Sequence, residues 1–171
     1  MDVKEAIVKR RSVRSFTVKD VSRSLLEEIM ESVRMAPSAS NRQDWKFIIV
    51  DRKATREMLY RAAEKQEFVR DAPVVIVGVA VQPNETMTCG VNAGNVDVAI
   101  ALDHLSLRAA EEGLGTCWIG AFDQEKTKEI LEIPESCKVI GLMPLGYPTY
   151  DLTEETKRRK ELSEIISYNS Y

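Results

Sequence analysis

Three arginines and two serines fall within one short segment near the start of the chain, Arg10 to Ser15. Guanidinium groups bind phosphate oxygens in pairs, and serine hydroxyls add directional hydrogen bonds. Alternate side chains of an extended segment share one side, which places Arg10, Ser12 and Arg14 together and turns Arg11 elsewhere. The pattern therefore predicts a cradle for a phosphorylated anion. The alternative is a solvated basic surface at the end of a helix, where arginines favour the helix dipole, and the segment alone favours neither.

A second segment, Pro37 to Trp45, joins a predicted helix to a predicted buried strand and is rich in serine, asparagine and glutamine. Connectors between rigid elements often form binding sites, because their backbone groups remain free. Their amide and hydroxyl side chains both donate and accept hydrogen bonds, which suits the edge of a heterocycle. Ordinary turn chemistry explains the same composition, and composition alone favours that simpler explanation.

The glycines between Gly113 and Gly120 superficially resemble a dinucleotide-binding loop. That loop follows a strand and opens a helix, whereas these glycines follow a predicted helix and open a predicted strand. Gly113 is better explained as the end of a helix. Gly120, inside a strand pattern, predicts the close approach of another backbone or of a flat ligand. The sequence has no phosphate-binding P-loop, so nucleoside triphosphate chemistry has no support.

The elements that must position these segments alternate between helical and strand character, without linkers or repeats. The 3-to-4 spacing of apolar residues predicts a short helix over 3–10 and a second one that begins near Ser22 or Ser24 and ends at Ala36-Pro37. Near-continuous apolar runs predict strands covered on both faces at 46–50, 74–81, 116–122 and 139–145.

A long helix is predicted over 92–112, and its polar residues Asp97, His104, Arg108 and Glu111 form only a narrow stripe. A helix that is apolar over most of its circumference must be covered on most sides, and a symmetric partner chain is the simplest cover. The apolar residues that follow the charged run in 153–171 also indicate cover by a partner chain. We therefore expect a homodimer with this helix at or beside the interface and 153–171 as an arm on the partner. A monomer with a central helix is the alternative.

Composition excludes several kinds of chemistry. The 171 residues are enough for one domain with its own core. His104 is the only histidine, and Cys89, Cys117 and Cys137 lie far apart, so a zinc site or a histidine-dependent hydrolytic mechanism lacks its residues. We expect His104 to lie on a helix surface.

The charge balance and the hydropathy of the chain argue against nucleic acid and membranes as partners. Its 24 basic and 27 acidic residues leave no basic stripe for nucleic acid. The longest apolar stretch, 73–81, is far shorter than the ~20 residues of a membrane helix, and the N-terminus has charges in place of an apolar signal core. We expect a cytoplasmic protein without nucleic-acid or membrane partners.

Taken in order along the chain, the motifs resemble the nitroreductase family of FMN-dependent oxidoreductases. They are R-R-S-V-R-S-F, A-P-S-A-S-N-R-Q-D-W, D-A-P-V-V-I-V, G-L-G-T-C-W-I-G, G-Y-P and R-K-E-L-S-E-I. The resemblance implies a single α+β domain over residues 1–171, with a mixed, largely antiparallel sheet flanked by helices. It also implies an intertwined homodimer with two FMN sites at the interface, each built from both chains.

The resemblance assigns residues to each part of the FMN. The phosphate and ribityl side would be held by Arg10, Arg11, Ser12 and Arg14, with Arg14 reaching the N1/O2 edge of the ring and Arg159 closing on the phosphate. The partner chain would supply Pro37, Ser38, Ala39 and Asn41. Along the ring near N5 would lie Trp118, Ile119 and Gly120, and Gln66 would reach the pyrimidine edge. Asp44 and Glu161 depart from the family, which usually has proline at the first of these positions and often has it at the second.

The implied activity is reduction of FMN by NADH or NADPH, followed by electron transfer to a nitroaromatic, a quinone or a similar small aromatic acceptor in a ping-pong mechanism. A cation near N1/O2 would stabilise the anionic reduced ring, and no catalytic side chain is then required. Two alternatives remain: a flavin-binding module without turnover, and a family variant that dehalogenates its substrate or fragments the flavin. The stretch 82–95 is the loop best suited to cover a substrate.

Overall fold

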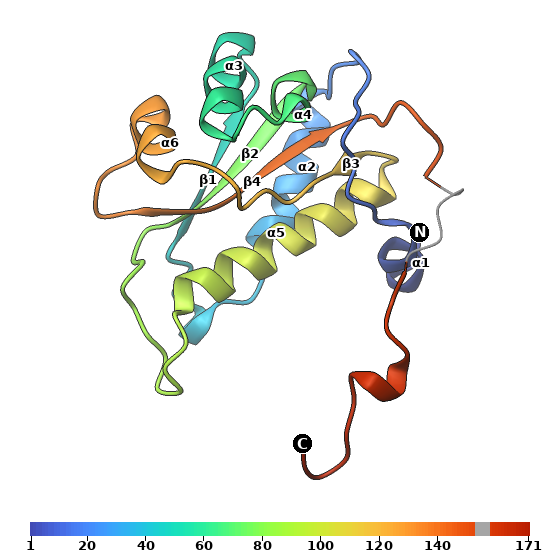
Figure 1. Ribbon diagram of the computed structural model, residues 1–171, viewed down its shortest axis with the longest axis vertical. Coiled ribbons are helices and arrows are strands. Elements are labelled where there is room, and N and C mark those ends of the chain that lie inside the picture. Colours follow the sequence, from blue (N-terminus) through green and yellow to red (C-terminus); the bar gives the residue numbers. More distant parts are fainter. Residues whose placement is uncertain (153–157) are drawn as a thin grey trace.

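The computed structural model describes residues 1–152 and 158–171, and this part of the chain contains a four-stranded sheet (Figure 1). The strands are β1 (Trp45–Val50), β2 (Val74–Ala80), β3 (Gly115–Thr116) and β4 (Lys138–Gly146), in the order β1-β2-β4-β3. Neighbouring strands pair antiparallel, and a single parallel bridge joins Ser12 to Thr116. The predicted α+β fold with a mixed, largely antiparallel sheet is confirmed.

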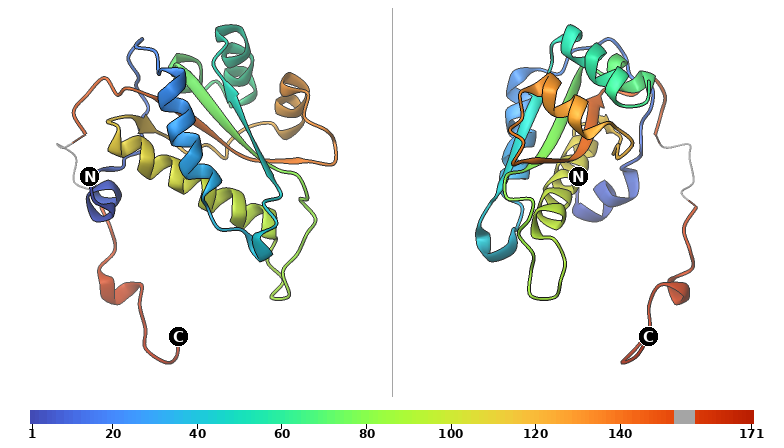
Figure 2. Two further views of the ribbon diagram at one scale, coloured as in Figure 1. Left: turned by 180° about the vertical axis from the view of Figure 1, so that it is seen from behind. Right: turned by 60° about the vertical axis from the view of Figure 1, so that its left-hand side comes forward.

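Helices cover both faces of the sheet, as the apolar runs predicted (Figure 2). Alternate residues of β2 point to opposite faces, and all seven are buried. One core cluster joins the sheet to α2 (Arg23–Arg34) and α5 (Ala93–Glu111); the other joins it to α3 (Lys53–Ala62), α4 (Glu67–Asp71) and α6 (Gln124–Leu131). The sequence analysis predicted α2 and α5 but not α3, α4 or α6.

The predicted helix over 92–112 is α5, which runs along the sheet and also packs against α2 and α1 (Val3–Lys9). Asn92 caps its first turn, accepting a hydrogen bond from the Asn95 N–H at 2.9 Å. At its other end Gly113 has φ +72°, a conformation that glycine adopts without strain. Ten of its residues are buried within one chain. The residues that are not buried include a stripe at 3-to-4 spacing: the part-exposed Val96, Ala99 and Leu107 and the exposed Asp103.

The helices at the N-terminus also follow the predicted pattern. Ser22, and not Ser24, caps α2, because its hydroxyl oxygen accepts a hydrogen bond from the Leu25 N–H at 3.3 Å. The helix ends at Arg34, just before Ala36 and Pro37. His104 is half-buried on α5, with Nδ1 3.3 Å from the Ser32 carbonyl oxygen of α2. Its ring therefore joins two helices.

The predicted strand over 116–122 is wrong beyond its first residue, because β3 ends at Thr116. Opposite Cys117 on β4 lies Pro144, which has no N–H to donate to the ladder. Pairing resumes only as an isolated bridge between Ile119 and Leu142. Gly120 consequently lies outside any strand, in the segment that leads to α6.

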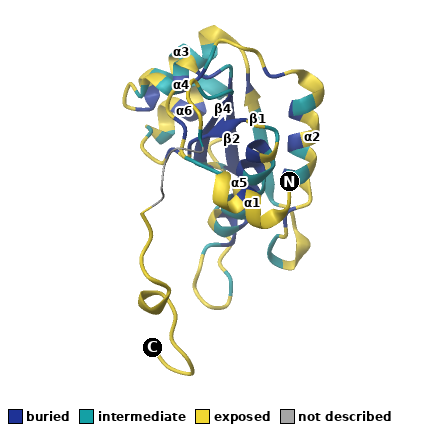
Figure 3. Ribbon diagram, turned by 90° about the vertical axis from the view of Figure 1, so that its right-hand side faces the viewer, coloured by how far each residue is buried: buried dark blue, intermediate teal, exposed yellow. Residues whose placement is uncertain are grey.

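The C-terminal residues 158–171 extend away from the body of the molecule and are exposed throughout (Figure 3). Within them a short 3-10 turn, η2 (Leu162–Glu164), follows the basic residues. The large apolar side chains of this segment are exposed: Leu162, Ile165, Ile166, Tyr168 and Tyr171. Part of the predicted arm, residues 153–157, lies outside the described residues. None of the helices over 1–152 and 158–171 is long and apolar enough to cross a bilayer.

Packing between the N-terminal segment and β3 gives the first prediction, for the variant Gly115→Ala. A Cβ at Gly115 would lie 2.4 Å from Cγ2 of Val13, whose side chain is fully buried. Overpacking of this kind costs about 1–3 kcal/mol. We expect a lower denaturant midpoint for unfolding of the protein without cofactor.

Gly120→Ala is the matched control, because a Cβ there would meet its nearest atom, Trp118 Nε1, only at 4.0 Å. We expect this variant to unfold at the wild-type midpoint when no cofactor is present. Equal midpoints for Gly115→Ala and wild type would show that Val13 is not packed as described.

Candidate functional site

The arginine-rich segment leaves α1 in an extended conformation and lies along β3. The Val13 N–H donates to the Thr116 carbonyl oxygen at 2.9 Å, beside the parallel bridge of Ser12 with Thr116. Val13 and Phe16 are buried, whereas Ser12 and Arg14 are exposed. The predicted alternation is therefore present: the apolar side chains anchor the segment and the polar ones face outward.

The second half of this segment is held by residues that follow β4. Phe16 bridges to Pro148, and the Thr17 N–H donates to the Tyr147 carbonyl oxygen at 2.8 Å. The Thr149 hydroxyl donates to Ser15 Oγ, also at 2.8 Å. Ser15 thus serves to hold the segment, and the chain is clamped from both sides.

A cavity of about 330 Å³ opens beside the arginine segment. It contains three residues that the sequence analysis assigned to cofactor binding, Arg10, Ser12 and Trp118. The other lining residues come from α5, β3 and β4: Ala99, Asp103, Ser106, Thr116 and Met143. Ligand pockets usually span about 300–1,000 Å³, so this one is at the small end of that range.

The sequence analysis missed two polar residues of this cavity, Asp103 and Ser106 on α5. The Ser106 hydroxyl donates to the Asp103 carbonyl oxygen at 2.9 Å and lies 3.3 Å from its carboxylate. Both are polar residues in a largely apolar helix, and this contrast is the feature of the sequence that could have identified them. Which side of α5 would meet the arginines depends on tertiary packing, which the spacing does not reveal.

Arg10 and Arg14 form no ion pair within residues 1–152 and 158–171. Their charges do act on Cys117, the buried residue that follows β3. Burial raises the pKa of the Cys117 thiol above its usual value, and Arg14 and Arg10 oppose this with smaller effects. The thiol is therefore protonated at neutral pH and is a poor nucleophile. The positive charge of the two arginines remains available to an anionic ligand.

Arg11 points back to the helix that precedes it. Its Nη1 donates to the Val8 carbonyl oxygen at 2.6 Å and contacts the Arg10 carbonyl oxygen at 3.3 Å. This is the helix-end role that the sequence analysis considered as the alternative for the arginines. Arg11 does not line the 330 Å³ cavity.

The segment Trp118 to Gly120 presents two of its residues to solvent and buries the third. The Trp118 ring lies against Gly141, where a Cβ would come within 2.9 Å of Cζ2 of the ring. Ile119 is buried and exchanges hydrogen bonds with Leu142 at 2.9 and 3.1 Å. Gly120 is exposed, with open space where a side chain would be. Trp118 lines the cavity together with Arg10, and the bare backbone of Gly120 follows two residues later.

Gln66 holds the end of this same segment. Its Nε2 donates to the Ala121 and Ala63 carbonyl oxygens, each at 3.2 Å. In this chain Gln66 therefore fixes the backbone next to Gly120.

The connector residues Pro37, Ser38, Ala39 and Asn41 do not line the cavity of their own chain. They lie near the start of α5, where the Ala39 N–H donates to the buried Asp97 carboxylate at 3.1 Å. Arg159 is also apart from the cavity, exposed in the C-terminal segment, with Nη1 donating to the Arg158 carbonyl oxygen at 2.8 Å. A single chain thus brings together only part of the predicted set.

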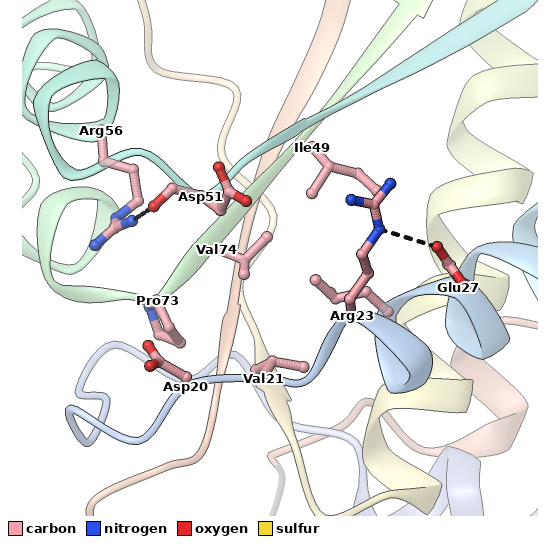
Figure 4. Close-up of a pocket in the computed structure, with 10 residues that line it drawn as sticks. Asp20, Val21, Arg23, Glu27, Ile49, Asp51, Arg56, Pro73 and Val74 are labelled. Atoms are coloured by element: carbon pink, nitrogen blue, oxygen red, sulfur yellow. Dashed lines mark hydrogen bonds and ion pairs between the residues drawn. The ribbon is translucent and has the colours of Figure 1, made fainter.

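A larger cavity, about 570 Å³, lies between the start of α2, β1 and the start of α3 (Figure 4). It contains none of the residues predicted to bind a cofactor. Its charged groups are largely balanced: Arg23 pairs with Glu27 at 3.1 Å, and Arg56 donates to the Asp51 carbonyl oxygen near the Asp51 and Asp20 carboxylates. The smaller cavity is lined by Arg10, which forms no ion pair within residues 1–152 and 158–171, and by one carboxylate, that of Asp103. The free guanidinium group of Arg10 makes this cavity the candidate site for an anion.

Comparisons with known proteins identify the family of this chain. The model of the "Nitroreductase family" matches residues 7–66 and 60–147. A putative NADH dehydrogenase/NAD(P)H nitroreductase of Methanothermobacter thermautotrophicus is 32% identical over 161 residues, covering 86% of this chain and 78% of the relative.

Two solved structures have the same fold. A nitroreductase family protein from Clostridium novyi NT is 36% identical, with a TM-score of 0.81 over 90% of this chain and 91% of the other. The NADPH:FMN oxidoreductase from Vibrio harveyi complexed with NAD+ is 26% identical, with a TM-score of 0.88 over 99% of this chain and 77% of the other. The chain therefore belongs to the nitroreductase family.

Proposed function

We propose that this protein is an FMN-dependent oxidoreductase that oxidises NADH or NADPH and passes the electrons to a nitroaromatic, a quinone or a similar small aromatic acceptor by a ping-pong mechanism. One observation carries the proposal: Arg10 lines the 330 Å³ cavity, the exposed Arg14 follows in the same segment, and neither forms an ion pair among the described residues. Membership of the nitroreductase family supports the coarser part, an oxidoreductase that uses FMN and NAD(P)H.

Residues in the cavity and in the two segments that border it fit the chemistry of FMN. A phosphate group requires cationic forks and hydroxyl donors, which Arg10, Arg14 and Ser12 provide. A planar ring requires an aromatic or bare backbone surface, and Trp118 and Gly120 present one. When bound, FMN would supply the hydride and electron chemistry. The chain would bind it, orient it and place positive charge beside it.

No side chain of the cavity is needed as an acid or a nucleophile. Cys117 keeps its proton because burial raises its thiol pKa. His104 lies elsewhere, half-buried between α2 and α5. The arginines would therefore take part without gaining or losing a proton, binding the FMN and stabilising the ring as negative charge develops on it.

The proposed active form is a homodimer in which residues 158–171 pack on the partner. Exposed leucine, isoleucine and tyrosine side chains in that segment and the part-exposed stripe on α5 both require cover. The partner's connector would then supply Pro37, Ser38, Ala39 and Asn41 to the flavin. The small size of the cavity in one chain agrees with a site completed by a second copy.

Purified protein, after reconstitution with FMN, should contain close to one flavin per chain. Anaerobic addition of NADH or NADPH should bleach the flavin absorbance near 450 nm within seconds, because hydride transfer to FMN needs no further protein group. Subsequent addition of a quinone should restore it. A protein that binds FMN but reacts with neither nucleotide would be a flavin-binding module without turnover, contrary to the proposal.

Replacing either arginine of the cradle should weaken FMN binding. Removing a hydrogen bond to a charged group costs about 1.5–3 kcal/mol, so Arg10→Ala and Arg14→Ala should each raise the Kd by roughly tenfold to a hundredfold. Fluorescence titration of the protein without cofactor measures this. Lys4→Ala, which removes an exposed positive charge from α1, should retain the wild-type Kd; equal Kd values for all four proteins would refute the cradle.

The arm is tested by the triple variant Leu162→Ser, Ile165→Ser, Ile166→Ser. Losing three exposed apolar side chains should not affect the core, but it should remove the cover they gain on the partner. We expect sedimentation to show more monomer and a weaker FMN affinity than in the wild type. The control Ser163→Ala, Ser167→Ala changes the same segment without removing apolar surface. A monomeric wild type, or an unchanged dimer in the triple variant, would contradict the arm.

A further inference from the structure

The loop over 82–92, which precedes α5, has a defined hairpin-like structure. Thr86 bridges to Asn92, and the Met87 N–H donates to the Val91 carbonyl oxygen at 2.9 Å. Gly90, with φ +85°, turns the chain, and its N–H donates to the Met87 carbonyl oxygen at 2.8 Å. At the base, the Ala93 N–H donates to the Glu85 carbonyl oxygen at 2.9 Å. The loop therefore has its own hydrogen-bonded shape.

Arg42 joins this loop to the connector between α2 and β1. Its Nε lies 3.3 Å from Asp44 Oδ2, and its Nη1 lies 3.3 Å from Glu85 Oε1. A backbone hydrogen bond from Val81 N–H to the Asp44 carbonyl oxygen, at 3.0 Å, joins the same two segments. In Figure 1 both segments lie beside the start of α5. Arg42 is the side chain that spans them.

The connector itself is held in an unusual conformation. Three non-glycine residues, Ser40, Asn41 and Gln43, have φ between 54° and 58°. Such backbone persists only where surrounding contacts hold it. The Ala39 N–H is fixed by Asp97, and the Gln43 N–H donates to Ser38 Oγ at 3.0 Å. Arg42 lies within this strained stretch, so its position is fixed on the connector side.

We propose that Arg42 is a positioning residue that holds the 82–92 loop as a wall of the acceptor site. This inference rests on the proposed function, in which the connector faces the flavin of the partner chain. A loop tied to that connector must lie near the same flavin. It carries Met87 and the exposed Val91, apolar side chains suited to a small aromatic acceptor.

Asp44 completes this arrangement on the connector side. With Asp44 in place, the guanidinium has one carboxylate on the connector and one on the loop. Exposed single ion pairs contribute little, but a shared arginine orients both segments together, so the expected effects are modest and measurable.

The first test is amide hydrogen exchange in the protein without cofactor, comparing wild type with Arg42→Gln. Exchange at Met87, Gly90 and Ala93 should become about threefold to tenfold faster, because the loop opens more often. Glu85→Gln, at an exposed side chain, should have the same effect, and the double variant should add little. The control is Arg23→Gln, whose exposed arginine pairs with Glu27 at 3.1 Å. It should leave these amides unchanged.

The second test is turnover with 2-methyl-1,4-naphthoquinone as acceptor. Arg42→Gln and Glu85→Gln should raise the KM for the quinone by about threefold to tenfold. The Kd for FMN and the rate of flavin reduction by NADH should match those of Arg23→Gln and wild type. A merely structural role for Arg42 would change the FMN Kd or the reduction rate together with the KM.

Unchanged loop exchange in both variants overturns the inference, and so does faster exchange with an unchanged quinone KM. Failure of the proposed function can be distinguished from failure of this inference, because the proposed function is tested on the wild type alone. Wild-type protein whose bound FMN neither nucleotide reduces refutes the proposed function, and this inference with it. A functional wild type with unaffected variants refutes only the role of Arg42.

Discussion

The candidate site depends on one contact, the packing of Val13 against Gly115 beneath the hydrogen bond from Val13 to Thr116. Val13 is fully buried, so the backbone on either side of it is fixed. Because side chains alternate along an extended chain, burying this one valine turns Ser12 and Arg14 outward. An apolar contact therefore determines where the charges lie. The glycine is required because any side chain at position 115 would occupy the volume that Val13 fills.

Charge is distributed unevenly between the 570 Å³ cavity and the 330 Å³ cavity, and this separates them more clearly than volume does. The larger one has arginines that already interact with neighbouring acidic residues or carbonyl oxygens. The smaller one has Arg10 at its wall, with Arg14 close enough to influence the same buried thiol. Neither arginine forms an ion pair within residues 1–152 and 158–171, and neither is buried, so both guanidinium groups are accessible to an anion. This accessibility favours a ligand role over a structural one.

The sequence predicted the elements whose residues repeat with a clear period, and it failed where contacts with distant residues decide. The apolar spacing of α2 and α5 and the apolar runs of β1, β2 and β4 were enough to place them. The early end of the strand predicted over 116–122 could not be foreseen from the residues of that segment, because the interruption comes from Pro144 on another strand. The helices α3, α4 and α6 are short, with ten, five and eight residues, and carry few large apolar side chains. In the site, the arginine segment was found from its composition, whereas Asp103 and Ser106 depend on how α5 is turned.

The clamp on the arginine segment also has a consequence for folding. Ser15 and Thr149, which hydrogen-bond to each other, are separated by 134 positions in the chain, and Ser12 pairs with Thr116 from the middle of the sequence. Contacts between such distant residues form late, because closing long loops costs chain entropy before any contact compensates. The cradle is therefore complete only when the start, middle and end of the sequence have all assembled. A ligand that binds it recognises the finished fold and will stabilise that fold against unfolding.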